Sequence, residues 1–237
     1  MPSSEEILAF WNAWDEAYLE IRPLDSMSVL RGERALNHVK KLHLDNPAIL
    51  EIGCGSGWLS SQLNSYGRVT GVDIADKVVC RAGQRYPDVR FLAGDFVVMD
   101  LPPASFDIIV VLEVIGNVPD QPAFFARMAL ALKPGGYLIA SCQNKMVYQR
   151  REDIVPLAIG QIRKWLGTRD VRALLRPNFR VVELVTIAPA GHLGVLRFVN
   201  SYRLESLAKR ICCFALLTSL KEGLGFGQSI VLLAQHK

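Results

Sequence analysis

The chain has 237 residues, which is room for one α/β domain with insertions rather than two full domains. Half of the residues are hydrophobic and 21% are charged, as in an ordinary globular protein, so residues 1–237 are treated as a single domain. The formal net charge of +4 is small, and no run of Lys and Arg occurs, so we expect no nucleic-acid partner.

The first residues, M-P-S-S-E-E-I, are acidic and lack the basic-then-apolar order of a signal peptide. No apolar stretch approaches the roughly 18 residues of a membrane-spanning helix. We therefore expect a cytoplasmic protein. Five cysteines without C-x-x-C spacing predict packed thiols, and neither a zinc site nor a disulfide framework.

Two helical patterns come first. Phe10, Trp11 and Trp14 recur at helical spacing among acidic residues over residues 4–19, and a second pattern covers residues 28–42. Residues 1–46 are therefore predicted to form a helical cap, which covers either the edge of a sheet or the mouth of a ligand site.

The most informative stretch is A-I-L-E-I-G-C-G-S-G-W-L-S at residues 48–60. Its short apolar run predicts a buried parallel strand. Gly53, Gly55 and Gly57 then allow positive φ and a close approach of the backbone to a ligand. Ser56 is predicted to cap a helix that begins near Trp58. The stretch thus predicts a strand, a tight turn that holds a small polar ligand, and a helix start.

Acidic residues end the next strands. Asp73 closes R-V-T-G-V-D, where it is placed to accept two ribose hydroxyls, to cap the helix predicted at 75–86, or to do both. A strand at 89–93 leads into Gly94-Asp95-Phe96. There Asp95 or its backbone would accept from an exocyclic amine, and the Phe96 ring would cover a base.

The central strand is F-D-I-I-V-V-L at residues 106–112, and it ends at Glu113. A helix at 123–132 and a strand at 137–141 follow. Alternating strands and helices predict a parallel sheet with helices on both faces, whose ligands bind at the carboxyl ends of the strands. Glu51, Asp73, Asp95 and Glu113 all fall there.

The last part is less regular. Residues 154–175 are predicted to be helical, 179–187 to form a strand, and 229–234 a terminal strand. The insertion at 188–227 is interpreted as a substrate lid, between a cofactor-binding core at 47–187 and the terminal strand segment at 228–237. Within it, the helix-like apolar stretch at 207–220, flanked by cations, also fits a weak peripheral membrane contact.

The spacing of the glycines discriminates between two cofactor classes. A dinucleotide turn needs G-x-G-x-x-G beside a pyrophosphate, whereas this chain has G-x-G-x-G preceded by Glu51. An acidic residue is unfavourable beside a pyrophosphate and favourable beside the amino group or sulfonium of S-adenosylmethionine. The pattern favours S-adenosylmethionine over NAD.

Five segments in order, E-I-G-C-G-S-G, V-D-I, A-G-D-F, F-D-I-I-V-V-L-E-V and K-P-G-G-Y-L, resemble class I S-adenosylmethionine-dependent methyltransferases, nearest to the ubiquinone-biosynthesis O-methyltransferase group. The resemblance implies an α/β, doubly wound, mostly parallel seven-stranded sheet (Rossmann-like) with N-terminal helices, a late insertion and a last antiparallel strand. It implies S-adenosylmethionine as methyl donor and S-adenosylhomocysteine as product. The implied cofactor-binding residues are Glu51, Gly53, Gly55, Gly57, Asp73, Ile74, Gly94, Asp95, Phe96, Leu112 and Glu113.

The chain departs from that group at Gly116 and Asn117, where the group carries an acid and a histidine associated with metal use. Glu113 and Asn117 are too few ligands for a cation, so we expect no metal site.

The expected reaction is methyl transfer to a small-molecule acceptor, most simply at oxygen. N-methylation, a peptide or carrier-bound acceptor, and a catalytically silent binding module remain alternatives. His192, in the loop P-A-G-H-L-G, is the candidate general base, and a surface histidine is the competing interpretation. Tyr148, Arg150 and Arg151 either line the acceptor pocket or begin a solvated helix.

Overall fold

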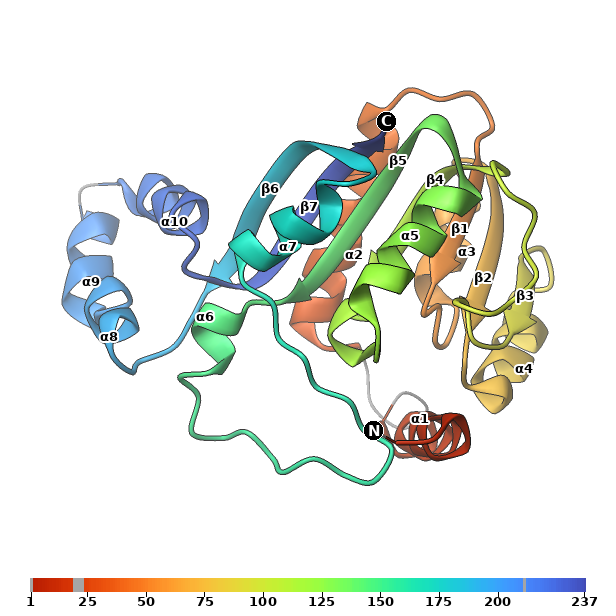
Figure 1. Ribbon diagram of the computed structural model, residues 1–237. Coiled ribbons are helices and arrows are strands. Elements are labelled where there is room, and N and C mark those ends of the chain that lie inside the picture. Colours follow the sequence, from red (N-terminus) through yellow and green to blue (C-terminus); the bar gives the residue numbers. More distant parts are fainter. Residues whose placement is uncertain (1, 19–23, 211) are drawn as a thin grey trace.

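A computed structural model describes residues 2–18, 24–210 and 212–237. Within these residues one seven-stranded sheet has the order β3-β2-β1-β4-β5-β7-β6 (Figure 1). The predicted doubly wound α/β fold is confirmed. The strands are β1 Ala48–Ile52, β2 Arg68–Asp73, β3 Arg90–Ala93, β4 Phe106–Leu112, β5 Leu132–Gln143, β6 Phe179–Pro189 and β7 Gly227–His236.

Strands β1 to β5 pair in parallel, and β7 pairs antiparallel with both β5 and β6. Because β7 runs the other way, its first residues lie beside the last residues of β5, and Ser229 pairs with Gln143. β7 is the terminal strand that the sequence predicts over 229–234. It brings the end of the chain to the carboxyl edge of the parallel strands.

Helices cover both faces of the sheet. Apolar residues of α2 and α3 pack on one face in one core cluster, while α5 and α7 pack on the other face in a second cluster. The helices are α1 Ser4–Tyr18, α2 Ser26–Lys41, α3 Trp58–Leu63, α4 Asp76–Arg85, α5 Gln121–Ala131, α6 Lys145–Tyr148, α7 Thr168–Leu175, α8 Val195–Val199, α9 Tyr202–Arg210 and α10 Phe214–Gly223.

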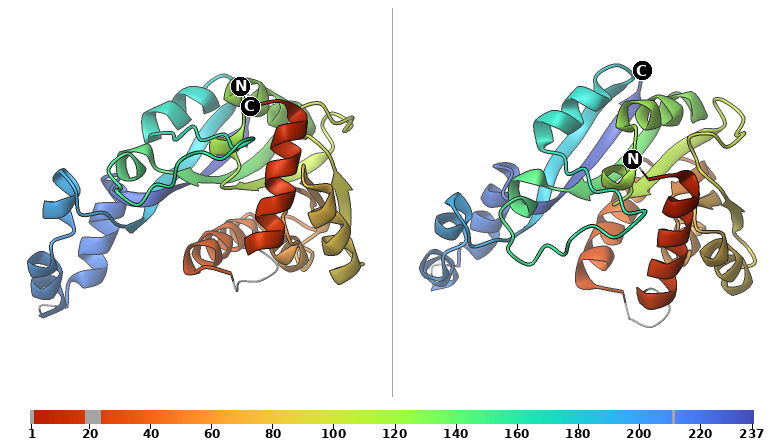
Figure 2. Two further views of the ribbon diagram at one scale, coloured as in Figure 1. Left: turned by 90° about the horizontal axis from the view of Figure 1, so that it is seen from below. Right: turned by 60° about the horizontal axis from the view of Figure 1, so that its bottom comes forward.

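Residues 149–167 form an extended connection that passes from α6 toward α1 at the carboxyl end of the sheet (Figures 1 and 2). The prediction of a helix over 154–175 is wrong for its first part, since only Thr168–Leu175 is helical. Pro156 lacks an N–H and disfavours helix at the residue before it. Gly160 takes φ +82°, where an added Cβ would lie 2.1 Å from the Glu6 carbonyl oxygen. This connection, named the crossing loop, therefore packs against α1.

The insertion after β6 is built differently from its prediction. Helices α8, α9 and α10 project beyond β6, at the edge of the sheet opposite β3 (Figure 2). The single helix expected over 207–220 is two helices, α9 and α10, and Ile211 lies outside the described residues. We name residues 190–226 the arm. The crossing loop, and not the arm, extends along the carboxyl ends of the central strands.

Two capping predictions are also corrected. The N-cap of α3 is Gly57, at φ +78° and without a side-chain cap, so Ser56 does not cap that helix. The N-cap of α4 is Ala75, so Asp73 is not the cap residue either. In the described part of the chain, no helix is both long and apolar enough to cross a membrane.

Candidate functional site

The glycine turn lies at the end of β1. Gly53, Gly55 and Gly57 have φ of +76°, +50° and +78°, in the region that side chains disfavour. An added Cβ at Gly53 would lie 2.2 Å from Cγ2 of Val114. The turn is therefore restricted to glycine both by its backbone conformation and by the residue packed against it.

Asp73 joins the glycine turn to the end of β2. Its Oδ2 accepts from the Gly55 N–H at 2.9 Å, and its Oδ1 accepts from the Ala75 N–H at 3.0 Å. Burial raises the pKa of Asp73, while these backbone donors oppose that shift. Each oxygen retains a further lone pair, so the carboxylate can still accept two hydroxyl donors. Ile74, the next residue, is half-buried beside it.

Glu51 lies underneath the turn. Its side chain is 4% exposed, and its Oε2 accepts from the Ser60 hydroxyl of α3. Burial raises the pKa of Glu51 to about 8, and the nearby Asp73 carboxylate adds to the rise. The Glu51 carboxyl group therefore faces α3.

The segment after β3 is only partly as expected. Gly94 donates its N–H to the Asp73 carbonyl at 2.8 Å, which places the segment beside the glycine turn. Asp95 is exposed, and its Oδ1 accepts from the Val97 N–H. Phe96, however, is 4% exposed and packs edge-on against Phe124. The idea that its ring covers a base is corrected, because the ring fills the core.

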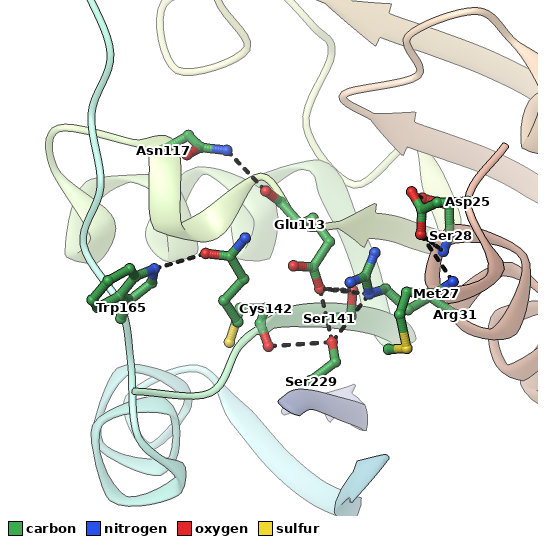
Figure 3. A network of polar contacts seen from close by, with 11 residues as sticks. Asp25, Met27, Ser28, Arg31, Glu113, Asn117, Ser141, Cys142, Trp165 and Ser229 are labelled. Atoms are coloured by element: carbon green, nitrogen blue, oxygen red, sulfur yellow. Dashed lines mark hydrogen bonds and ion pairs between the residues drawn. The ribbon is translucent and has the colours of Figure 1, made fainter. Parts of the chain in front are cut away.

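Glu113 follows β4 and is the centre of a polar network (Figure 3). Its Oε1 accepts from the hydroxyls of Ser141 and Ser229, each at 2.8 Å, and lies 3.1 Å from Nε of Arg31. Its other oxygen, Oε2, is buried and has no hydrogen-bond partner among the described residues. Leu112, which precedes it, is half-buried. One carboxylate thus joins α2, β4, β5 and β7.

A cavity of about 20 Å³ lies beside this network. The crossing loop supplies its aromatic wall, Trp165, whose indole N–H donates to Gln143 Oε1 at 2.7 Å. The cavity lining consists of Glu113, Gly116, Asn117, Gln143, Arg163 and Trp165. Arg31, Ser229, Gln143 and Trp165 were not predicted from the sequence.

Gly116 and Asn117 thus occur where the cavity forms. In the described residues, no three His, Cys, Asp or Glu side chains are grouped closely enough to hold a metal ion. The Asn117 side chain instead donates to the Glu113 carbonyl at 2.9 Å.

At and just after the end of α6 lie the three predicted pocket residues Tyr148, Arg150 and Arg151. Burial raises the pKa of the Tyr148 hydroxyl, and the Glu113 carboxylate raises it further. The Tyr148 ring lies 5.6 Å from that of Trp165, and the Arg151 guanidinium lies 5.2 Å from the Tyr148 ring centre. Arg150 donates to the Met146 carbonyl. Of the three residues, Tyr148 is the one that faces the Glu113 network.

His192 is not brought to this place. Its side chain is 76% exposed, 3.8 Å from the Glu152 carboxylate. It follows β6, which is three strands away from β4, or roughly 14 Å at the usual spacing of strands. The structure therefore leaves the predicted base outside the group that contains Asp73 and Glu113.

A larger pocket, of about 460 Å³, is unrelated to these residues. It lies against β2 and β3, where the described connection from β3 to β4 contains no helix, and Thr70, Arg90 and Met99 contribute to its wall. None of the predicted site residues lines it, so the chemistry is assigned to the carboxyl ends of β1, β2 and β4.

The fold and this edge of the sheet define a class I S-adenosylmethionine-dependent methyltransferase. Residues 50–140 match the family described as Methyltransferase domain. The chain is 32% identical over 201 residues to the ubiquinone biosynthesis O-methyltransferase of Idiomarina loihiensis. The matching region covers 80% of this chain and 79% of that protein. The chain therefore belongs to the S-adenosylmethionine-dependent methyltransferases.

Solved structures share the fold. The N-methyltransferase NodS of Bradyrhizobium japonicum, in complex with S-adenosylhomocysteine, has a TM-score of 0.65 at 18% identity and covers 98% of both chains. A putative methyltransferase in complex with the Haloferax volcanii activator Trm112 has a TM-score of 0.66 at 19% identity, covering 98% of this chain and 97% of that one.

The residues present fit S-adenosylmethionine, the cofactor of this family. The half-buried Asp73 carboxylate has acceptor positions for ribose hydroxyls, and the glycine turn beside it excludes any Cβ at Gly53. Glu113 lies at the same edge of the sheet, and its buried Oε2 has no partner in the described residues. When bound, the cofactor supplies an electrophilic methyl group on a sulfonium.

Proposed function

We propose that the protein transfers a methyl group to a hydroxyl oxygen of a small-molecule acceptor. The observation that carries this proposal is the small cavity beside Glu113, which combines polar atoms with the Trp165 ring. Its volume of about 20 Å³ suits one water-sized polar group, such as a hydroxyl. The name of the Idiomarina relative is consistent with transfer to oxygen.

Cofactor binding is assigned to the residues at the ends of β1, β2 and β3. Gly53, Gly55 and Gly57 would pack against the methionine part, and Asp73 would accept from the ribose hydroxyls. Asp95 and the backbone of Gly94 would contact the adenine. The other predicted residues complete the proposed cofactor environment. Ile74 and Leu112 would border the ligand, Phe96 would contribute its backbone only, and Glu113 would lie at the end of β4. Glu51, whose pKa is about 8 in the free protein, would give up its proton to balance the positive charge of the ligand.

The protein's main task is to align and dehydrate the reacting groups, because methyl transfer is an in-line displacement. The crossing loop does part of this by packing Gly160 against α1 and Trp165 against the end of β5. Glu113 and the cavity would fix the acceptor hydroxyl. The acceptor is thus held by the crossing loop and the end of β4.

The test is methyl transfer from S-adenosylmethionine to matched aromatic acceptors. A phenol and the corresponding aniline should be compared by mass spectrometry of the methylated products. We expect the methyl ether. Transfer to nitrogen alone would favour N-methylation instead, and modification of a peptide with no small-molecule product would favour the carrier-bound alternative.

A second proposal concerns the arm. It exposes large apolar side chains, among them Phe198, Tyr202 and Leu216 at 76%, 84% and 70% exposure. Exposed cations lie among them, including Arg203 and Lys209. Apolar groups interspersed with cations bind weakly to anionic bilayers. The predicted peripheral membrane contact through residues 207–220 is therefore retained and extended to the whole arm.

A further inference from the structure

Glu113 has an unusual backbone conformation. Its φ of +61° is in the left-handed region, which non-glycine residues rarely adopt. Two hydrogen bonds hold it there: its N–H donates to the Ser141 carbonyl at 3.0 Å, and its carbonyl accepts from the Asn117 side chain. Such conformations persist when the surroundings fix them, and they occur often at functional sites.

The two oxygens of the Glu113 carboxylate have different environments. Oε1 receives the hydroxyls of Ser141 and Ser229 and the Arg31 guanidinium (Figure 3). Oε2 is buried and has no partner in the described part of the chain. A buried carboxylate oxygen without a donor is unfavourable, so it is suited to a ligand that brings a donor.

The cavity beside Glu113 supplies complementary groups. Gln143 uses its Oε1 to accept from Trp165, so its amide N–H groups are directed elsewhere. Asn117 uses its amide nitrogen on the Glu113 carbonyl. A hydroxyl in the cavity can therefore accept from the Gln143 amide and donate to Glu113.

We propose that Glu113 Oε2 is the general base of the reaction and that the Gln143 amide positions the acceptor oxygen, an inference that rests on the proposed O-methylation. The hydroxyl proton passes to Oε2 while a bond forms between the acceptor oxygen and the methyl carbon. The methyl–sulfur bond breaks, and its electron pair stays on sulfur, which becomes neutral. The proton then returns from Glu113 to solvent.

Charged and titratable groups surround Glu113 on each neighbouring element. Arg31 faces it from α2, Tyr148 from α6, Cys142 from β5 and Arg163 from the crossing loop. Burial raises the pKa values of both Tyr148 and Cys142, so neither loses a proton in the neutral range. Arg31 compensates the carboxylate charge. Neither Tyr148 nor Cys142 therefore competes with Glu113 for the role of base.

A binding experiment tests the assignment without turnover. The probe is 4-nitrophenol, whose absorbance reports its ionisation, bound to the complex of the protein with S-adenosylhomocysteine. A carboxylate accepts from the neutral hydroxyl and repels the phenolate, so wild type should raise the pKa of the bound probe by about one unit. Glu113→Gln should remove most of that rise. The matched control is Glu152→Gln, since Glu152 is 72% exposed, and it should behave as wild type.

Gln143→Met provides a second variant that keeps the carboxylate. It removes the donor to the probe oxygen, so the pKa of the bound probe should rise beyond its wild-type value, which is the opposite of the effect of Glu113→Gln. Equal probe pKa values in wild type and Glu113→Gln would overturn the proposal, as would the absence of saturable probe binding to wild type. Failure of wild type to bind S-adenosylhomocysteine would instead contradict the proposed function.

Turnover supplies the second measurement. With a phenol acceptor, Glu113→Gln should lower kcat about 100-fold or more and flatten its pH profile, with S-adenosylhomocysteine affinity within a few-fold of wild type. If affinity and kcat fell together while the pH profile kept its shape, Glu113 would have only a structural role and the assignment would be wrong.

Discussion

Nε of Arg31 lies 3.1 Å from Oε1 of Glu113, so a helix that precedes the sheet is joined by a largely buried ion pair to the end of its central strand. The same nitrogen donates to the Ser229 hydroxyl at 3.2 Å. Residues from the beginning, middle and end of the chain therefore meet at one carboxylate. The orientation of the Glu113 side chain therefore depends on contacts from all three segments.

Arg31→Met should destabilise the protein by about 2–4 kcal/mol, because it leaves the Glu113 charge buried without its cation. Urea denaturation measures the free energy of unfolding. Arg34→Met is the matched control, since Arg34 is exposed on the same helix and should change stability by less than about 0.5 kcal/mol. Adding Glu113→Gln to Arg31→Met should restore part of the loss. Strict additivity of the two changes would show that the pair is not coupled.

The sequence predicts one half of this network and not the other. The apolar run of β4 predicts that strand and places Glu113 at its end, because this signal is local to the chain. Arg31 is one cation on an ordinary amphipathic helix. Ser229 is a polar residue in an apolar strand, and it reaches Glu113 only because β7 lies antiparallel beside β5. Such pairings depend on topology, which no local pattern contains.

The crossing loop was missed for a related reason. Apolar residues over 154–175 suggest a helix, yet Val155 and Ile159 are 71% and 83% exposed, so they form no buried helical face. Pro156 and Gly160 are the signals that could have indicated an irregular segment. Trp165 then enters the site through tertiary packing, and its hydrogen bond to Gln143 has no signature in the sequence.

Asp73→Ala should weaken S-adenosylhomocysteine binding by about 1–3 kcal/mol, the cost of leaving ribose hydroxyls unpaired. The structure adds a second reason, because the same carboxylate holds the Gly55 N–H of the glycine turn. Isothermal titration calorimetry measures the affinity. Asp88→Ala, at an exposed position before β3, is the control and should bind as wild type does. Unchanged affinity in Asp73→Ala would restrict Asp73 to a role in the turn.

Glu51 should make stability depend on pH in the absence of ligand. Its pKa is about 8 in the folded protein, against an ordinary value of 4.5, so the folded state binds the proton more tightly. Its contribution is complete below pH 4.5 and is lost as the pH rises toward 8. The slope is at most about 1.4 kcal/mol per pH unit.

Glu51→Gln should remove this slope, as measured by urea denaturation at several pH values between about 5 and 8. Glu16→Gln, which replaces an exposed carboxylate on α1, should leave the slope as it is in wild type. The same pH dependence in wild type and Glu51→Gln would mean that Glu51 is already ionised throughout this range.

His192→Ala should keep kcat within about twofold of wild type, because the imidazole is exposed and lies beyond the edge strand β6. Steady-state kinetics on a phenol acceptor measures it. A fall of about 100-fold with unchanged S-adenosylhomocysteine affinity would restore His192 as the base. It would also require the arm to move toward β4 during the reaction.

The arm should bind anionic bilayers. Wild type should float with vesicles of phosphatidylcholine and phosphatidylglycerol, and float less with phosphatidylcholine alone or at high salt, because cations such as Lys209 contribute to binding. Phe198→Ser combined with Leu216→Ser should reduce flotation about tenfold, since each removes an exposed apolar side chain that would enter the bilayer.

Val98→Ser is the matched control, because Val98 is 80% exposed before β4 and far along the sheet from the arm. Equal flotation of the three proteins, or none by wild type, would contradict a membrane contact through the arm.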